Sequence, residues 1–108
     1  MTDENVVQII RELSDELKAL YPEFRGIYLF GSYARGDARE DSDLDVAVII
    51  NTDVDSKIKK EIGHIVYEYD LKYDILLDEH IYNYKDIFAP ITPLRQNIKT
   101  EGIYYAPS

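Results

Sequence analysis

The stretch that decides the fold runs from Gly31 to Asp45 and reads GSYARGDAREDSDLD. One apolar run, residues 27–30, precedes it, and a second, residues 46–50, follows it. Short apolar runs bounded by turn residues are typical of buried β-strands. We therefore predict two strands joined by this stretch, with a small-residue pair where the first strand ends and two carboxylates where the second begins.

The small-residue pair Gly31-Ser32 predicts a phosphate-binding turn. Backbone N–H groups at the start of a helix attract anions, and glycine lets a phosphate approach the backbone closely. Ser32 stands at the expected N-cap of a short helix over residues 33–35, and Arg35 lies one turn further on. Gly31, Ser32 and Arg35 are thus the candidate nucleotide-binding residues. The alternatives are an ordinary turn at Gly31-Ser32 and, for Arg35, a solvated or ion-paired arginine at the surface.

Asp43 and Asp45 are the first candidate catalytic and metal-binding residues. Side chains two positions apart on a strand lie on the same face, so both carboxylates are expected together while Leu44 is turned into the core. Two like charges side by side repel each other unless a cation joins them. Mg²⁺ is bound in proteins by one or two carboxylates together with water and substrate phosphates.

Asp74 is the third candidate, within a strand predicted over residues 72–77. An ionised carboxylate in an apolar strand is costly without a partner, so we expect this strand beside the second one, with all three carboxylates on one face. Such a set matches a two-metal phosphoryl-transfer site, in which Asp74 would also accept the proton of the attacking hydroxyl. The alternative is that Asp74 simply reaches solvent.

The remaining elements complete a small α/β domain of the α+β type. Apolar residues at helical spacing predict helices that cover a sheet of three strands, with a fourth possible at the edge. Residues 81–88 are aromatic-rich and are interpreted as helical, and residues 103–105 as a tail docked on the core. The predicted helices span residues 3–20, about 54–70 after a cap at 51–53, and 93–101 after Thr92.

Composition narrows the class of protein. The 108 residues suit one compact domain, no apolar segment is long enough to span a membrane, and there is no cysteine. The N-terminus lacks the pattern of a signal peptide, so we expect a cytoplasmic protein with no membrane contact. Twelve basic against 21 acidic residues give a net charge of −9. This charge disfavours direct nucleic-acid binding and favours a basic partner, or reflects solubility alone.

The motif as a whole resembles a known family. The string FGSYARG at residues 30–36, followed by SDLD at residues 42–45 and by Asp74, is similar to the polymerase-β-type nucleotidyltransferase superfamily. It is most similar to the minimal nucleotidyltransferase (MNT) branch, whose members are encoded beside a HEPN partner in toxin–antitoxin pairs. The resemblance covers nearly the whole chain and implies a nucleotidyltransferase fold with a mixed sheet, as a single domain over residues 1–108.

The resemblance also implies an activity. Members of this branch are antitoxins that transfer AMP from ATP to a tyrosine hydroxyl of the HEPN ribonuclease toxin, in a hetero-oligomer with it. By position, Gly31 and Ser32 would hold the triphosphate, and Asp43, Asp45 and Asp74 would carry two Mg²⁺ ions. Two other functions stay open: an antitoxin that masks its toxin stoichiometrically with little or no catalysis, and nucleotidyl transfer to a small molecule.

Overall fold

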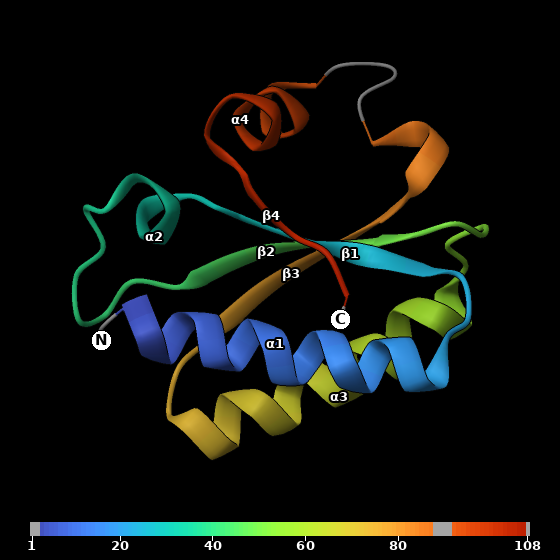
Figure 1. Ribbon diagram of the computed structural model, residues 1–108, viewed down its shortest axis with the longest axis horizontal. Coiled ribbons are helices and arrows are strands. Elements are labelled where there is room, and N and C mark those ends of the chain that lie inside the picture. Colours follow the sequence, from blue (N-terminus) through green and yellow to red (C-terminus); the bar gives the residue numbers. More distant parts are fainter. Residues whose placement is uncertain (1–2, 88–91, 108) are drawn as a thin grey trace.

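The structure is a computed structural model that describes residues 3–87 and 92–107. A four-stranded sheet lies between two layers of helices, with α1 and α3 on one face and α4 on the other (Figure 1). The predicted mixed sheet flanked by helices is thereby confirmed. The elements are α1 Asp3–Leu20, β1 Phe24–Phe30, α2 Ser32–Arg35, β2 Leu44–Ile50, α3 Ser56–Tyr73, β3 Leu77–Asn83, a 3₁₀ turn Tyr84–Asp86, α4 Pro93–Glu101 and β4 Ile103–Tyr105.

The strand order β3-β2-β1-β4 determines which side chains meet. β1 and β2 are antiparallel and are joined by the stretch that begins at Gly31, so Phe30 lies opposite Asp45. α3 is the crossover to β3, which is parallel to β2 and places Asp78 opposite Asp45. β4 pairs antiparallel with the other side of β1. The end of β1, the start of β2 and the start of β3 therefore lie at one end of the sheet.

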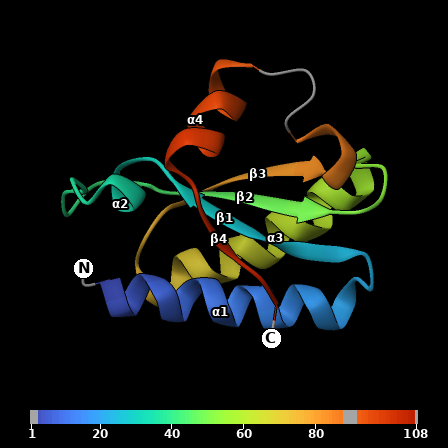
Figure 2. The same cartoon turned by 45° about the horizontal axis from the view of Figure 1, so that its top comes forward.

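Alternation along the strands divides the apolar side chains between two cores. Leu44, Val46 and Val48 point toward α1 and α3 and are fully buried with the apolar stripe of α1. Ala47 and Ile49 point to the opposite face, where they pack with Phe30, Ile87 and Ile98 beneath α4. Figure 2 shows the two layers on either side of the sheet. By the same alternation, Asp45 lies on the face that carries α4.

Helices α1 and α3 are linked by polar contacts as well as by their apolar faces. The Tyr69 hydroxyl donates a hydrogen bond to the Glu16 carboxylate at 2.8 Å, and Lys72 pairs with Glu12 at 2.8 Å. None of the helices in the described ranges is long and apolar enough to cross a membrane.

Several predicted boundaries are correct and others are wrong. The helices over residues 3–20 and 93–101 are confirmed, and Thr92 caps the latter by accepting the Arg95 N–H at 3.2 Å. The middle helix is capped by Asp55, not by residues 51–53, because the Asp55 carboxylate accepts the Ile58 N–H at 2.9 Å. It also continues three residues beyond the predicted end at Asp70, to Tyr73.

The prediction of a strand over residues 72–77 is wrong. α3 extends through Tyr73, Asp74 adopts a left-handed conformation that ends the helix, and the strand starts only at Leu77. The interpretation of residues 81–88 as a helix is also wrong, since residues 81–83 complete β3 and a 3₁₀ turn follows. Phe88 lies outside the described residues. The tail over residues 103–105 is the fourth, edge strand.

Candidate active site

The turn at Gly31 is built for close contact with the second strand. Gly31 has a φ of 75°, a conformation that L side chains rarely adopt, and a β-carbon there would overlap the Asp45 carboxylate. Gly31 is the N-cap of α2, so the prediction of Ser32 as N-cap is wrong: Ser32 is the first helical residue. The first backbone hydrogen bonds of this turn run from the N–H groups of Ala34 and Arg35 to Gly31 O. The amides of Ser32 and Tyr33 precede them.

Glu101 completes this turn and was missed in the sequence. As the last residue of α4, it accepts a hydrogen bond from the Gly31 N–H at 3.0 Å. Its two carboxylate oxygens also accept from Arg35 Nη1 at 3.1 and 3.2 Å. A carboxylate is therefore seated on two of the three predicted nucleotide-binding residues. Nothing in the local sequence around Glu101 indicates this contact.

Arg35 is held from two sides. Its Nε lies 3.3 Å from the Asp37 carboxylate, and its Nη1 bonds to Glu101. Hydrogen bonds to Asp37 and then to Glu101 raise the pKa of Arg35 above its ordinary value, so the guanidinium remains charged. Among the described residues, no hydrogen bond to its Nη2 atom is found. This edge of the guanidinium is available for another anion.

Asp45 is the carboxylate of the site whose ionisation is opposed by its surroundings. Burial, and then the charges of Asp78 and Asp43, raise the pKa of Asp45 above its ordinary value. Asp43 immediately precedes β2 and Asp78 lies opposite Asp45 on β3. Asp78 is also within 3.4 Å of His80 Nε2, a contact that is an ion pair when the histidine is protonated. The predicted pairing of Asp43 with Asp45 thus gains an unpredicted neighbour, Asp78.

Asp74 lies at the same end of the sheet but not on the expected strand. At the end of α3 it has a φ of 51° and donates its N–H to Asp70 O. It lines a hollow of about 390 Å³ together with Asp43, Ser42 and Tyr33. No hydrogen bond or ion pair of its carboxylate is found within residues 3–87 and 92–107. Asp74 is therefore near Asp43 but is not aligned beside Asp45.

The donor set suits a hard cation. All candidate ligands are carboxylate oxygens, which Mg²⁺ prefers, and a divalent ion would relieve the repulsion that raises the pKa of Asp45. Within the described ranges, no three or more His, Cys, Asp or Glu side chains are arranged to hold a metal by themselves.

A glycine turn with an arginine, followed by carboxylates at the start of two adjacent strands, is suited to phosphoryl transfer, in which donors hold phosphates and carboxylates hold metal ions. Comparison with known proteins gives the family. Residues 10–106 match the family described as the nucleotidyltransferase domain, and the chain belongs to this family. The predicted family and the prediction of a nucleotidyltransferase are thereby confirmed.

Curated relatives are similar over much of the chain. A Methanocaldococcus jannaschii protein provisionally named a protein adenylyltransferase is 38% identical over 78 residues, which cover 71% of this chain and 79% of the relative. Protein adenylyltransferase MntA of Shewanella oneidensis is 31% identical over 98 residues, which cover 91% of this chain. This chain spans only 62% of the length of MntA.

Solved structures show the same fold. A toxin–antitoxin crystal structure with AMP-PNP matches with a TM-score of 0.62 at 22% identity, over 100% of this chain and 75% of the other. The complex of the tri-AMPylated Shewanella oneidensis HEPN toxin with its MNT antitoxin contains a match with a TM-score of 0.52 at 21% identity. That match covers 97% of this chain and 69% of the other.

Proposed function

We propose that this chain is a single nucleotidyltransferase domain over residues 1–108 that transfers AMP from ATP to a tyrosine hydroxyl of a HEPN-type toxin, and so acts as its antitoxin. The observation that carries the proposal is the carboxylate of Glu101 on the Gly31 amide and Arg35. A carboxylate already occupies these donors, and Gly31 lies directly beside Asp45. The names of the relatives, protein adenylyltransferases, support the same reaction.

The triphosphate is proposed to lie on the turn that starts at Gly31. The amides of Ser32 and Tyr33, the Ser32 hydroxyl and the Nη2 edge of Arg35 are proposed donors for its oxygens, because none of them makes a hydrogen bond to another group within residues 3–87 and 92–107. The Gly31 amide joins them when Glu101 withdraws. A triphosphate bound by these donors would lie next to Asp43 and Asp45.

Asp43, Asp45 and Asp74 are proposed as ligands of Mg²⁺, two ions in the full site. When bound, Mg²⁺ would neutralise charge on the carboxylates and phosphates. Asp74 is proposed as the third ligand because it lines one hollow with Asp43 and has no other partner among the described residues. Asp78 is the rival, since it lies opposite Asp45, but its carboxylate already contacts His80.

In the proposed reaction the hydroxyl oxygen of the toxin tyrosine attacks the α-phosphorus of ATP. A new oxygen–phosphorus bond forms, the bond to the bridging oxygen of the β-phosphate breaks, and pyrophosphate leaves with that electron pair. Asp74 accepts the hydroxyl proton. The chain contributes mainly by positioning the triphosphate for attack by the hydroxyl. It also places hydrogen-bond donors beside the phosphate oxygens, where negative charge develops in the transition state.

The proposed partner is a HEPN-type toxin in a hetero-oligomer with this chain, in the cytoplasm. Support comes from the solved neighbour in which a HEPN toxin is AMPylated and bound to its MNT antitoxin. The net charge of −9 would attract a basic partner and repel nucleic acid, so no direct contact with nucleic acid is expected.

The test is to mix the chain with ATP labelled on the α-phosphate, Mg²⁺ and the protein encoded by the adjacent gene. Label on a tyrosine of that protein, lost with Asp43→Asn and with Asp45→Asn, is the expected result. If Asp43→Asn and Asp45→Asn transfer no label but still neutralise the toxin, the chain acts by stoichiometric masking. Consumption of ATP with a small acceptor and no protein present would point to a small-molecule substrate.

A further inference from the structure

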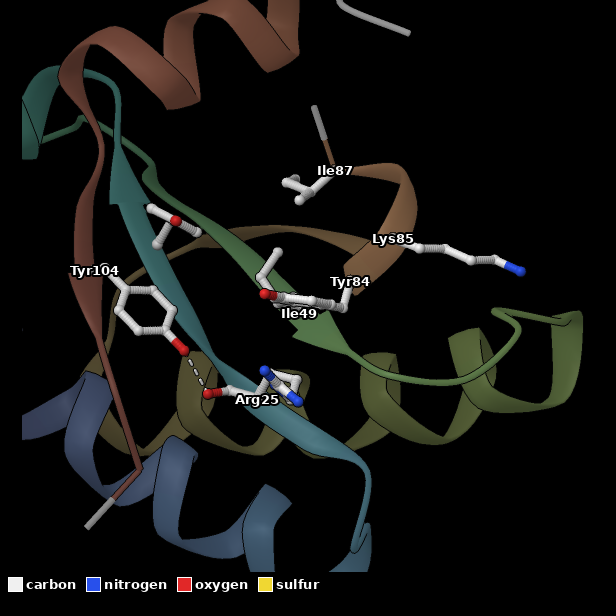
Figure 3. Close-up of a pocket in the computed structure, with 7 residues that line it drawn as sticks. Arg25, Ile49, Tyr84, Lys85, Ile87 and Tyr104 are labelled. Atoms are coloured by element: carbon white, nitrogen blue, oxygen red, sulfur yellow. Dashed lines mark hydrogen bonds between the residues drawn. The ribbon is translucent and has the colours of Figure 1, made fainter. Parts of the chain in front are cut away.

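A second hollow is lined by residues of β1, β2, β4 and the 3₁₀ turn, and Figure 3 shows its lining side chains. Its volume is about 570 Å³, within the range of small-ligand and side-chain pockets. Arg25, near the start of β1, lines it, whereas Gly31 follows the last residue of that strand. Arg25 therefore lies about 20 Å along β1 from Gly31. Tyr28, in the middle of β1, also lines the hollow, but none of its lining residues is a candidate active-site residue.

The floor and one wall of the hollow are aromatic and apolar. Ile49 and Ile87 form part of the lining, and the rings of Tyr28 and Tyr104 lie 4.8 Å apart, centre to centre. The Tyr104 hydroxyl donates a hydrogen bond to Arg25 O, which ties the edge strand β4 to the start of β1. Tyr104 is nevertheless 46% exposed. The wall is therefore fixed in place while its ring remains accessible.

The rim is cationic in an acidic chain. The Arg25 guanidinium lies 4.2 Å from the centre of the Tyr84 ring, and Lys85 extends from the next residue. Figure 3 shows Arg25 beside Tyr84, and Lys85 directed outward. Within residues 3–87 and 92–107, neither cation is paired with a carboxylate. Two unneutralised cations frame an aromatic hollow on a chain whose net charge is −9.

We propose that this hollow docks a segment of the partner protein in which a large aromatic side chain lies between acidic residues. The apolar floor would bury the aromatic ring, and Arg25 and Lys85 would pair with the flanking carboxylates. Tyrosine walls and an arginine are typical of sites where one inserted side chain contributes much of the binding energy. The proposal rests on the proposed function in one respect: the docked partner is taken to be the same protein that receives the AMP group.

Docking at this distance has a specific kinetic consequence. A partner held here presents its acceptor hydroxyl to the other end of the sheet at a raised effective concentration. Loss of the dock should raise KM for the partner protein while kcat and nucleotide affinity stay unchanged, because the dock contacts neither ATP nor the reacting hydroxyl.

The direct test is a titration of the ¹⁵N-labelled chain with two peptides of opposite charge, acetyl-Glu-Asp-Phe-Glu-Asp-amide and acetyl-Lys-Lys-Phe-Lys-Lys-amide. The acidic peptide should shift the backbone amide signals of Arg25, Tyr84 and Tyr104, and the basic peptide should not.

Arg25→Glu combined with Lys85→Glu should weaken acidic-peptide binding at least tenfold. Tyr84→Ala, which keeps both cations, should also weaken it. The matched control is Lys57→Glu with Lys59→Glu on the exposed face of α3, which makes the same change of charge and should leave binding unchanged.

Other outcomes would overturn the proposal. These are equal shifts with the basic peptide, no shifts at millimolar peptide, shifts confined to other surfaces, or the same shifts produced by AMP. Concentration-dependent shifts without any peptide would instead show a second copy of the chain on this face, and would also overturn it. Titration of the same sample with a non-hydrolysable ATP analogue tests the proposed function separately. Peptide binding without nucleotide binding would keep the dock and reject the proposed reaction, whereas the reverse would reject only the dock.

Discussion

The carboxylate of Glu101 accepts a hydrogen bond from the backbone N–H of Gly31 at 3.0 Å, across 70 positions of the chain. The same carboxylate holds Arg35. Because Glu101 is followed by Gly102 and then by β4, which pairs with β1, the end of α4 is fixed beside the turn after β1. The candidate phosphate site is thus filled by a side chain of the same molecule.

Glu101→Gln is expected to increase the affinity for ATP. The amide keeps an oxygen that accepts the Gly31 N–H, but it removes the negative charge that holds Arg35 and repels phosphate. Charged contacts at partly exposed sites contribute up to about 1 kcal/mol, which corresponds to roughly three- to fivefold tighter binding. Calorimetric titration with a non-hydrolysable ATP analogue measures the change.

Glu61→Gln is the matched control for this substitution. Glu61 also accepts a hydrogen bond, from the Tyr21 hydroxyl at 2.7 Å, but it lies on α3, away from the Gly31 turn. Its amide variant should leave ATP affinity unchanged. Weaker binding by Glu101→Gln would contradict the expectation and would mean that Glu101 positions Arg35 for the nucleotide.

Gly31→Ala should destabilise the chain more than Gly36→Ala. Both glycines have positive φ, 75° and 85°, so alanine at either position costs about 1–2 kcal/mol of conformational strain. A β-carbon at Gly31 would meet the Asp45 carboxylate, whereas one at Gly36 would have no described atom within 4 Å beyond the adjacent residues. Overpacking of this kind adds about 1–3 kcal/mol. Urea unfolding followed by circular dichroism measures both variants, and equal losses would contradict the contact with Asp45.

Tyr21 should make stability depend on alkaline pH. Burial, followed by its hydrogen bond to Glu61, raises the pKa of Tyr21 from 10.0 to about 12. Because the folded chain holds this proton more tightly than the unfolded chain, the stabilisation is fully present below pH 10 and is lost as the pH rises toward 12. Unfolding free energies of the wild type and Tyr21→Phe are compared from pH 8 to pH 11. The advantage of the wild type should shrink only above pH 10, and a pH-independent difference would reject this linkage.

The parts of the fold that local pattern predicts are those in which one sequence signal dominates. The stripe of α1 and the apolar runs of β1 and β2 predict these elements because burial there is continuous. The start of α4 is predicted by a different local signal, an N-cap at Thr92 followed by proline at the first helical position. The pairing of the Gly31 turn with Asp45 then follows from the connection between two neighbouring strands.

What could not be predicted depends on contacts across the chain. The end of α3 is decided by the left-handed conformation of Asp74 and by a bond from the Leu77 N–H to the Asp70 carboxylate at 2.9 Å, neither of which periodicity indicates. A shift of this boundary moves Asp78, rather than Asp74, opposite Asp45. The position of Glu101 requires the sheet order itself, because β4 must first pair with β1.

The assignment of the third carboxylate can be decided by Asp74→Asn and Asp78→Asn, each of which removes one charge and keeps the shape of the side chain. We expect Asp74→Asn to reduce kcat for AMP transfer at least about 100-fold, the usual scale for loss of a proton acceptor. Asp78→Asn should change kcat less than about fivefold, because an exposed charge beside Asp45 contributes little. Rates are measured with the wild-type partner protein at saturating ATP, after each variant is shown to unfold at the wild-type urea concentration. A large loss with Asp78→Asn and a small one with Asp74→Asn would move the role to β3, since Asp78 lies opposite Asp45 in the register of the parallel pair.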